Sequence, residues 1–142
     1  MNIEEKQTEI IDEFGLFLDW SEKYEYIISM GKKLPLINDE LKTDEYRIKG
    51  CQSQVWLDAD LDEYGNVIFK ADSDAIITKG IIAMLIRVMS GHTPEEIAHA
   101  DLHFVDEVGL KEHLSPTRAN GLAMMVKKMK MYGIAYMAKS EK

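Results

Sequence analysis

The chain has 142 residues, a formal net charge of -8 and 46% hydrophobic residues. This length and composition favour one folded domain, residues 1–142, and the acidic balance argues against a general nucleic-acid-binding protein. The single cysteine excludes an internal disulfide and a cysteine framework for zinc or an iron–sulfur cluster.

No segment of the sequence predicts a membrane span or a secretory signal. The longest apolar stretch, 75–89, is interrupted by Lys79 and Arg87, and it is shorter than the roughly 20 residues that a span requires. The N-terminal residues are acidic and lack the apolar region of a signal peptide. We therefore expect a cytoplasmic protein whose thiol is reduced.

The N-terminal part of the chain predicts two amphipathic helices. Apolar side chains at helical spacing run from Ile3 to Leu18, with glutamates on the other face. Asp19, followed three residues later by Glu22, predicts the N-cap of a second helix that ends at 31–33.

The hydrophobic period changes to two after the polar segment 36–45, which we interpret as a loop. Alternating residues at 55–61 and 67–72, joined by a turn around Gly65, predict a β-hairpin, and 46–49 predicts a short third strand. The expected fold class is α+β, with a small antiparallel sheet of about three strands packed against helices.

Three helices are expected in the second half of the chain. A helix at 75–90, capped by Ser73 or Asp74, is apolar on nearly all sides and should form the buried centre of the domain. The sequence Thr-Pro-Glu-Glu at 93–96 has the pattern of a capped helix start with proline at N1. Ser-Pro at 115–116 opens a long final helix.

The final helix is basic, although the chain as a whole is acidic. Residues 116–142 hold six Lys or Arg and one Glu, while the rest of the chain holds 11 basic and 24 acidic residues. Such a face is more often solvated than bound to a partner. Met124 and Met131 fall opposite the apolar stripe of this helix, so they are either covered by another element or available for contacts.

Cys51 follows Gly50 in a polar loop. It is either a buried cysteine that acts as a small hydrophobe or a reactive thiol at a loop tip, and the surrounding residues leave both interpretations open. If 46–51 is extended, Arg47 and Lys49 lie on the same side as Cys51 and favour its thiolate. Without a second cysteine or a histidine motif, a working thiol would form an adduct, a sulfenic acid or a persulfide.

Other polar residues give weaker signals. His99 and His103 share a helical face, but two ligands do not complete a zinc site, so we assign no metal to them. Arg118 is expected at N3 of the final helix, where a cation opposes the helix dipole. A residue placed against its local preference serves packing, an ion pair or a functional site.

Several blocks of the sequence resemble the SufE family of sulfur-acceptor proteins. The most specific is the cysteine loop at 50–57, Gly-Cys-Gln-Ser-Gln-Val-Trp-Leu. The others follow in the family's order: Leu-Pro-Leu at 34–36, Ala-Asp-Ser-Asp-Ala at 71–75, Lys-Gly at 79–80, and Ser-Pro-Thr-Arg-Ala-Asn-Gly-Leu at 115–122.

The resemblance implies an α+β fold similar to that of the scaffold protein IscU. It also implies a role in which a SufS-type cysteine desulfurase, the protein that carries pyridoxal phosphate, passes sulfur to an acceptor cysteine. The acceptor delivers that sulfur to a SufBCD-type scaffold for iron–sulfur clusters. Carried over by position, Cys51 is the persulfide acceptor and carrier, and Arg118 lies in a shared block as a supporting residue. The chain would bind no cofactor and would stimulate the desulfurase rather than act as a stand-alone enzyme.

The resemblance is also the basis for an expectation about motion. We expect the loop to hold Cys51 under apolar neighbours in the free protein, and docking to turn it outward. Trp56 would pack against this loop or meet the partner. Two other functions fit the residues: a redox sensor that responds to oxidation of Cys51, and an interaction module with an inert cysteine that uses the final helix. A homodimer is possible, and the sequence does not decide whether one forms.

Overall fold

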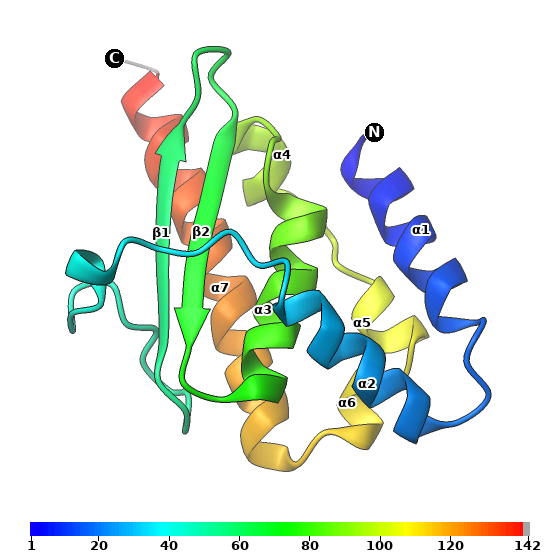
Figure 1. The fold of residues 1–142 in the computed structure, drawn as a ribbon. Coiled ribbons are helices and arrows are strands. Elements are labelled where there is room, and N and C mark those ends of the chain that lie inside the picture. Colours follow the sequence, from blue (N-terminus) through cyan, green and yellow to red (C-terminus); the bar gives the residue numbers. More distant parts are fainter. Residues whose placement is uncertain (141–142) are drawn as a thin grey trace.

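The structure is a computed structural model that describes residues 1–140. Two helices, a two-stranded antiparallel sheet and five further helices follow one another along these residues (Figure 1). The bounds are α1 Ile3–Phe14, α2 Trp20–Gly31, β1 Val55–Leu61, β2 Val67–Ser73, α3 Ile76–Met89, α4 Pro94–Ala98, α5 Phe104–Glu107, α6 Leu110–His113 and α7 Pro116–Ser140, with a short 3-10 turn, η1, at Asp39–Leu41. The α+β class is confirmed.

The first two helices begin and end close to the predicted positions, with one correction. The side chain of Asp19 accepts a hydrogen bond from the backbone N–H of Glu22, as an N-cap should. The predicted continuation of α1 to Leu18 is wrong, because the helix ends at Phe14. Gly15 follows directly and disfavours further helix, and Leu18 is 93% exposed.

The two strands pair along their whole length, from Val55 opposite Ser73 to Leu61 opposite Val67. Alternate side chains of both strands are buried, as the period-two pattern predicts: Val55, Leu57, Ala59, Val67, Phe69 and Ala71. α7 runs behind the hairpin in Figure 1. The hydroxyl groups of Tyr132 and Tyr136 on α7 donate hydrogen bonds to the β1 carbonyls of Leu57 (3.2 Å) and Ala59 (2.7 Å) respectively.

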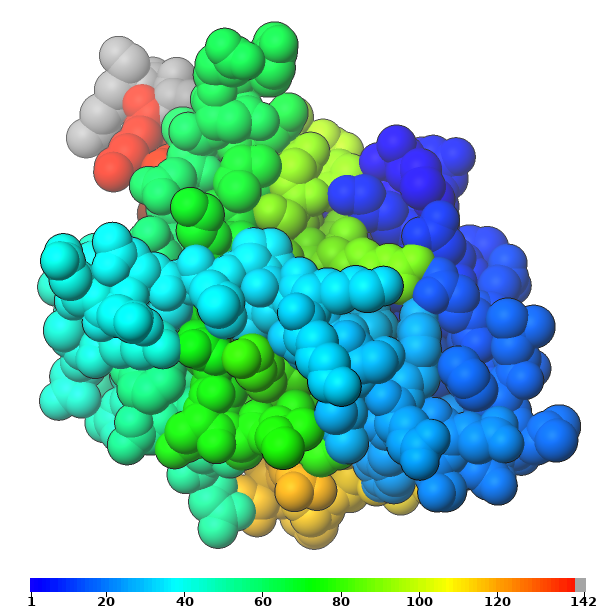
Figure 2. Space-filling model, in the orientation of Figure 1, coloured from blue at the N-terminus to red at the C-terminus, as the bar shows by residue number. Residues whose placement is uncertain are grey.

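The predicted third strand at 46–49 is not formed, because this segment makes only an isolated bridge between Arg47 and Trp56. After α2 the chain meets the free edge of β2 at Leu36. It then crosses in front of the hairpin, in cyan in Figure 1 and Figure 2, to reach β1 on the other side. Because the segment crosses the sheet, only its last residues align with β1 before the turn at 49–50 ends the pairing.

α3 is the buried centre of the molecule, as predicted from its apolar sequence. Ten of its 14 residues are buried. α2 crosses it so closely that a Cβ at Gly80 would lie 2.2 Å from the carbonyl oxygen of Ile27, and one at Gly31 would lie 3.1 Å from the backbone nitrogen of Gly80. Glycine at these positions therefore allows the backbones of the two helices to touch.

The predicted side-chain caps are present at one of the next two helices and absent at the other. Thr93 and Glu96 form the expected capping box at the start of α4. Ala75 is the N-cap residue of α3 and makes no side-chain cap, so the prediction that Ser73 or Asp74 caps α3 is wrong. No helix within residues 1–140 is long and apolar enough to cross a membrane.

Candidate functional site

Cys51 lies in a short loop that leads into β1 and rests on α7. Gly50 has a φ of 91°, a left-handed backbone conformation that favours glycine and that turns the chain just before the cysteine. A Cβ at Gly50 would lie 3.0 Å from Met124, and a Cβ at Gly121 would lie 3.4 Å from the Cys51 Sγ. The two glycines therefore let the thiol lie directly against the backbone of α7.

The thiol of Cys51 is half-buried and packs against the hydrophobic core. Its S–H group donates to the carbonyl of Gly121, with an Sγ to oxygen distance of 3.6 Å. Burial raises the pKa of Cys51, because a thiolate loses hydration there. The structure therefore presents the cysteine as a neutral, partly shielded thiol.

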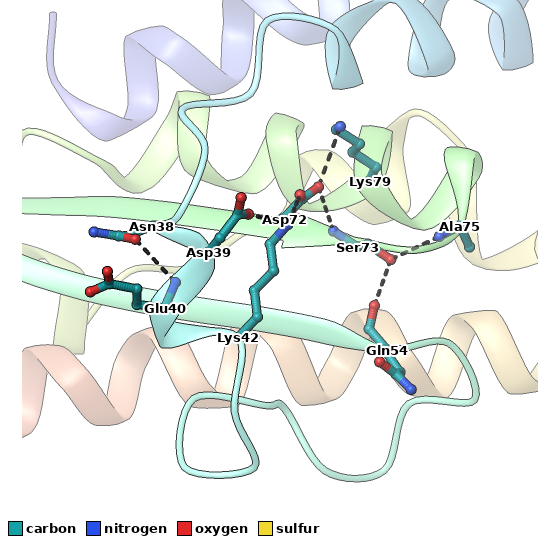
Figure 3. A network of polar contacts seen from close by, with 9 residues as sticks. All are labelled: Asn38, Asp39, Glu40, Lys42, Gln54, Asp72, Ser73, Ala75 and Lys79. Atoms are coloured by element: carbon teal, nitrogen blue, oxygen red, sulfur yellow. Dashed lines mark hydrogen bonds and ion pairs between the residues drawn. The ribbon is translucent and has the colours of Figure 1, made fainter.

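Hydrogen bonds hold the cysteine loop on both sides. Before the cysteine, the side-chain amide of Asn120 donates to the carbonyl of Gly50 (3.2 Å). After it, the N–H of Gln54 donates to the carboxylate of Asp74 (3.0 Å), and the carbonyl of Gln54 accepts from the hydroxyl of Ser73 (2.8 Å), as Figure 3 shows for the second bond. Residues 51–53 therefore form a short bridge between two anchored points.

Asp72 secures the strand end from which Ser73 reaches this loop (Figure 3). Its carboxylate pairs with the ammonium groups of Lys42 (2.7 Å) and Lys79 (3.3 Å) and accepts the N–H of Ser73 (2.8 Å). Burial raises the pKa of Asp72, but its hydrogen bonds with Lys42, Ser73 and Lys79 outweigh burial, so the pKa of Asp72 is lowered. Lys42 also lies over the ring of Trp56, which is half-buried, at 5.7 Å.

A cavity of about 80 Å³ adjoins the thiol. This volume is large enough for one further sulfur atom bonded to Sγ. The cavity is lined by Cys51, Gln52, Ser53, Thr78, Ile81, Thr117, Arg118, Gly121 and Met125. It therefore combines residues of the loop, α3 and the first turns of α7.

Arg118 is the cation that the fold brings to this cavity. Its backbone N–H bonds to the hydroxyl of Ser115 (3.3 Å), which fixes the first turn of α7. Its side chain is exposed and forms no ion pair within residues 1–140. The guanidinium is therefore available to an anion that forms at Cys51.

Arg47 and Lys49 do not lie beside the thiol, so the expectation that they favour the thiolate is wrong. Both line a separate groove that shares no lining residue with the Cys51 cavity, and Arg47 pairs with Asp44 at 3.5 Å. The turn at Gly50 interrupts the extended backbone on which the expected alternation depended. Burial is the cause that shifts the pKa of Cys51.

The histidine pair does not converge on a common ligand. His99 contacts the carbonyl of Glu95 in its own helix (2.9 Å). His103 contacts the carboxylates of Glu107 (2.7 Å) and Glu4 (2.6 Å). Residues 1–140 hold no group of three or more side chains placed to bind a metal ion.

Several residues of the site had no predicted role. Asn120 and Gly121 lie in a block that the family resemblance covers, but nothing in their spacing indicates that they touch the cysteine loop. Thr78 and Met125 belong to helices whose patterns predict only burial. The contacts arise where α3, α7 and the loop meet, which a single sequence does not specify.

The SufE family model, described as an Fe-S metabolism associated domain, matches residues 8–133. This chain belongs to the SufE family. The resemblance identified in the sequence is thereby confirmed. Membership associates the protein with iron–sulfur metabolism.

Two SufE-like relatives are similar along most of this chain. SufE-like protein 1, chloroplastic/mitochondrial, of Arabidopsis thaliana is 38% identical over 136 residues, which is 96% of this chain and 37% of that protein. The chain thus spans little more than a third of the plant relative. An uncharacterized SufE-like protein of Rhizobium meliloti (strain 1021) is 39% identical over 129 residues, 86% of this chain and 90% of the relative.

A solved structure shares the fold. The solution structure of a hypothetical protein from Thermus thermophilus has a TM-score of 0.77 and 19% sequence identity, and the match covers 94% of this chain and 96% of that one. At this identity the likeness shows the fold alone. It confirms the helices and small antiparallel sheet as a known arrangement.

Proposed function

We propose that this protein accepts sulfur from a cysteine desulfurase on Cys51, carries it as a persulfide and delivers it to a scaffold for iron–sulfur clusters. The observation that carries the proposal is the placement of the single cysteine. It lies on a loop anchored at both ends, beside a cavity of about 80 Å³ that Arg118 also lines. Family membership supports the same reaction.

The transfer is a thiol exchange that needs one thiol from each protein. The thiolate of Cys51 attacks the terminal sulfur of the desulfurase persulfide, and the new S–S bond forms as the old one breaks. The desulfurase cysteine leaves as a thiolate, so no external oxidant or reductant is consumed. Arg118 would stabilise the anionic persulfide that results on this chain.

The free protein holds Cys51 in a state that disfavours this attack. Burial raises the pKa of Cys51, and the backbone carbonyl of Gly121 accepts a hydrogen bond from its S–H group. Docking would therefore release the bond to Gly121 and expose the sulfur. The 51–53 bridge is short enough for a local change at its two anchors to move the thiol. The same release would explain why the acceptor stimulates the desulfurase, since it removes product sulfur from that enzyme.

The proposal includes the remaining partners. The donor is a SufS-type enzyme that holds its own pyridoxal phosphate, and this chain contributes the acceptor thiol without a cofactor. The receiver is a SufBCD-type scaffold. We propose a cytoplasmic location, and the desulfurase and scaffold would each meet the chain at the Cys51 loop, whether the chain is a monomer or a homodimer.

A mass measurement tests the function. The protein is incubated with its cognate cysteine desulfurase and free cysteine, and its intact mass is taken without reductant. We expect a gain of one sulfur atom in the natural protein and none in Cys51→Ser. No gain in the natural protein, together with ready oxidation of Cys51 by dilute peroxide, would overturn sulfur transfer in favour of a redox sensor.

A further inference from the structure

A groove of about 400 Å³ lies between the turn at 44–49 and the middle of α7. Four cationic side chains line it, Arg47, Lys49, Lys127 and Lys128, together with two carboxylates. It shares no lining residue with the Cys51 cavity. The family role described above assigns nothing to this groove.

The groove concentrates positive charge on a chain whose formal net charge is -8. Arg47 is paired with Asp44 (3.5 Å), and Lys128 lies over the ring of Tyr132 at 5.4 Å. Lys49 and Lys127 form no ion pair within residues 1–140. These two lysines therefore keep their charge available for a partner.

The groove also has an apolar floor. Met131 is 50% exposed there, and Met124 is half-buried beside it. An exposed methionine among cationic side chains suits an adaptable contact with an apolar side chain. Such a mixture of charge and apolar surface is typical of a protein interface. A nucleic acid is disfavoured because its dense phosphate charge would extend beyond the groove over a chain whose formal net charge is -8.

Met124 connects the groove to the cysteine loop. A Cβ at Gly50 would lie 3.0 Å from its side chain, so this methionine supports the residue that precedes Cys51. Asn120, one helical turn earlier on α7, donates to the carbonyl of Gly50. A partner seated in the groove would therefore press on one of the two anchors of the loop.

We propose that this groove docks an acidic surface of the cysteine desulfurase that loads Cys51. The inference rests on the proposed function and adds the surface by which the donor is recognised. The donor is favoured over the receiver because the thiol that it must reach is half-buried and bonded to Gly121, and the groove adjoins an anchor of the loop that shields it. A receiver meets the persulfide instead.

The test compares two double charge reversals with the same change in net charge. Lys127→Glu/Lys128→Glu alters the groove, and Lys32→Glu/Lys139→Glu alters two exposed lysines outside it. Sulfur loading from the desulfurase is timed by intact mass at low and high salt. Loading of each variant from glutathione persulfide is timed in parallel, and circular dichroism confirms folding.

We expect the ratio of desulfurase loading to glutathione persulfide loading to fall about 10-fold in the groove variant at low salt. At about 0.5 M salt the loss should shrink to about two-fold, because ions screen the attraction. The control pair should stay within about two-fold of the natural protein throughout.

Equal ratios for the groove variant and the control pair would overturn the docking site while leaving sulfur transfer intact. A groove variant that loads normally but unloads slowly to the scaffold would also overturn it, because the groove would then serve the receiver. If the natural protein gains no sulfur from the desulfurase, the proposed function itself fails. The failures of the two proposals are thus distinct.

Discussion

Arg87 and Arg118 each line a cavity, but they differ in whether a carboxylate neutralises their charge. Arg87 on α3 donates hydrogen bonds to the carboxylates of Glu9 and Glu13, so its charge is already neutralised by α1. Arg118 on α7 forms no ion pair within residues 1–140 and lines the cavity of Cys51. The first holds helices together, and the second is available to a reacting anion.

The cavity beside the paired arginine, Arg87, is the larger of the two. The one beside Arg87 has a volume of about 520 Å³, and the one beside Cys51 has about 80 Å³. The arginine of the larger cavity is already paired with carboxylates, and no cysteine lines that cavity, while the smaller cavity joins a thiol, an arginine without an ion pair among residues 1–140 and an anchored loop. Available chemistry, rather than volume, distinguishes the candidate site.

Replacing Arg118 should have the largest effect on the loading of Cys51. We expect Arg118→Ala to slow desulfurase-driven loading of Cys51 by about 10-fold or more, because a charge-assisted contact to the persulfide anion is lost. The unfolding free energy should change by less than about 0.5 kcal/mol, since the side chain is exposed. Single-turnover loading and urea unfolding measure the two effects. If Arg118→Lys restores the loading rate, the positive charge at this position is sufficient and the shape of the guanidinium is not required.

Arg87→Gln should have the reverse profile. It leaves Glu9 and Glu13 without their cation and should lower the unfolding free energy by about 1–2 kcal/mol, less than for a buried pair because the Arg87 side chain is 30% exposed. Loading of Cys51 should stay within about two-fold of the natural protein. A loss of loading as large as that of Arg118→Ala in a folded variant would contradict the division between the two arginines.

Asp74→Ala should loosen the loop without touching either arginine. The N–H of Gln54 loses its acceptor, so we expect faster hydrogen exchange over 52–54 and alkylation of Cys51 by iodoacetamide that is about 2–5-fold faster. Asp12→Ala, on the exposed face of α1, is the control. Unchanged alkylation in Asp74→Ala would show that the remaining anchors, Ser73 and Asn120, are enough to shield the thiol.

The smallest expected effect is on acid stability. Hydrogen bonds from Arg87 are the largest cause that lowers the pKa of Glu13, so the folded state binds that proton more weakly than the unfolded state does. This stabilisation is complete above the ordinary pKa of a glutamate and is lost as pH falls through the lowered folded value. Urea unfolding between about pH 6 and pH 3 should therefore show a smaller acid loss in Arg87→Gln than in the natural protein. If the unfolding free energies of the two proteins fall in parallel with pH, Arg87 does not lower the pKa of Glu13.

The helices and the hairpin were predictable because their signals are local. The apolar sequence of α3 and the alternation of β1 and β2 both follow from side-chain period, and the capping box of α4 follows from residues 93–96. The predictions of a third strand and of a side-chain cap for α3 were wrong for the same reason. Each depended on where a segment distant in the sequence would lie. Ser73 and Asp74, which have the right chemistry for a cap, bind Gln54 instead.

The sequence by itself determined the fold class, the family and the single thiol on which any sulfur chemistry must depend. Composition, period and the blocks around Cys51 carry that information because each is local or is matched position by position. Only the tertiary structure decided which cation stands beside the thiol, since the turn at Gly50 separates Arg47 and Lys49 from Cys51 while α7 brings Arg118 to it. The direction of a side chain after a left-handed turn depends on the packing of the whole chain, and spacing along the sequence does not encode it.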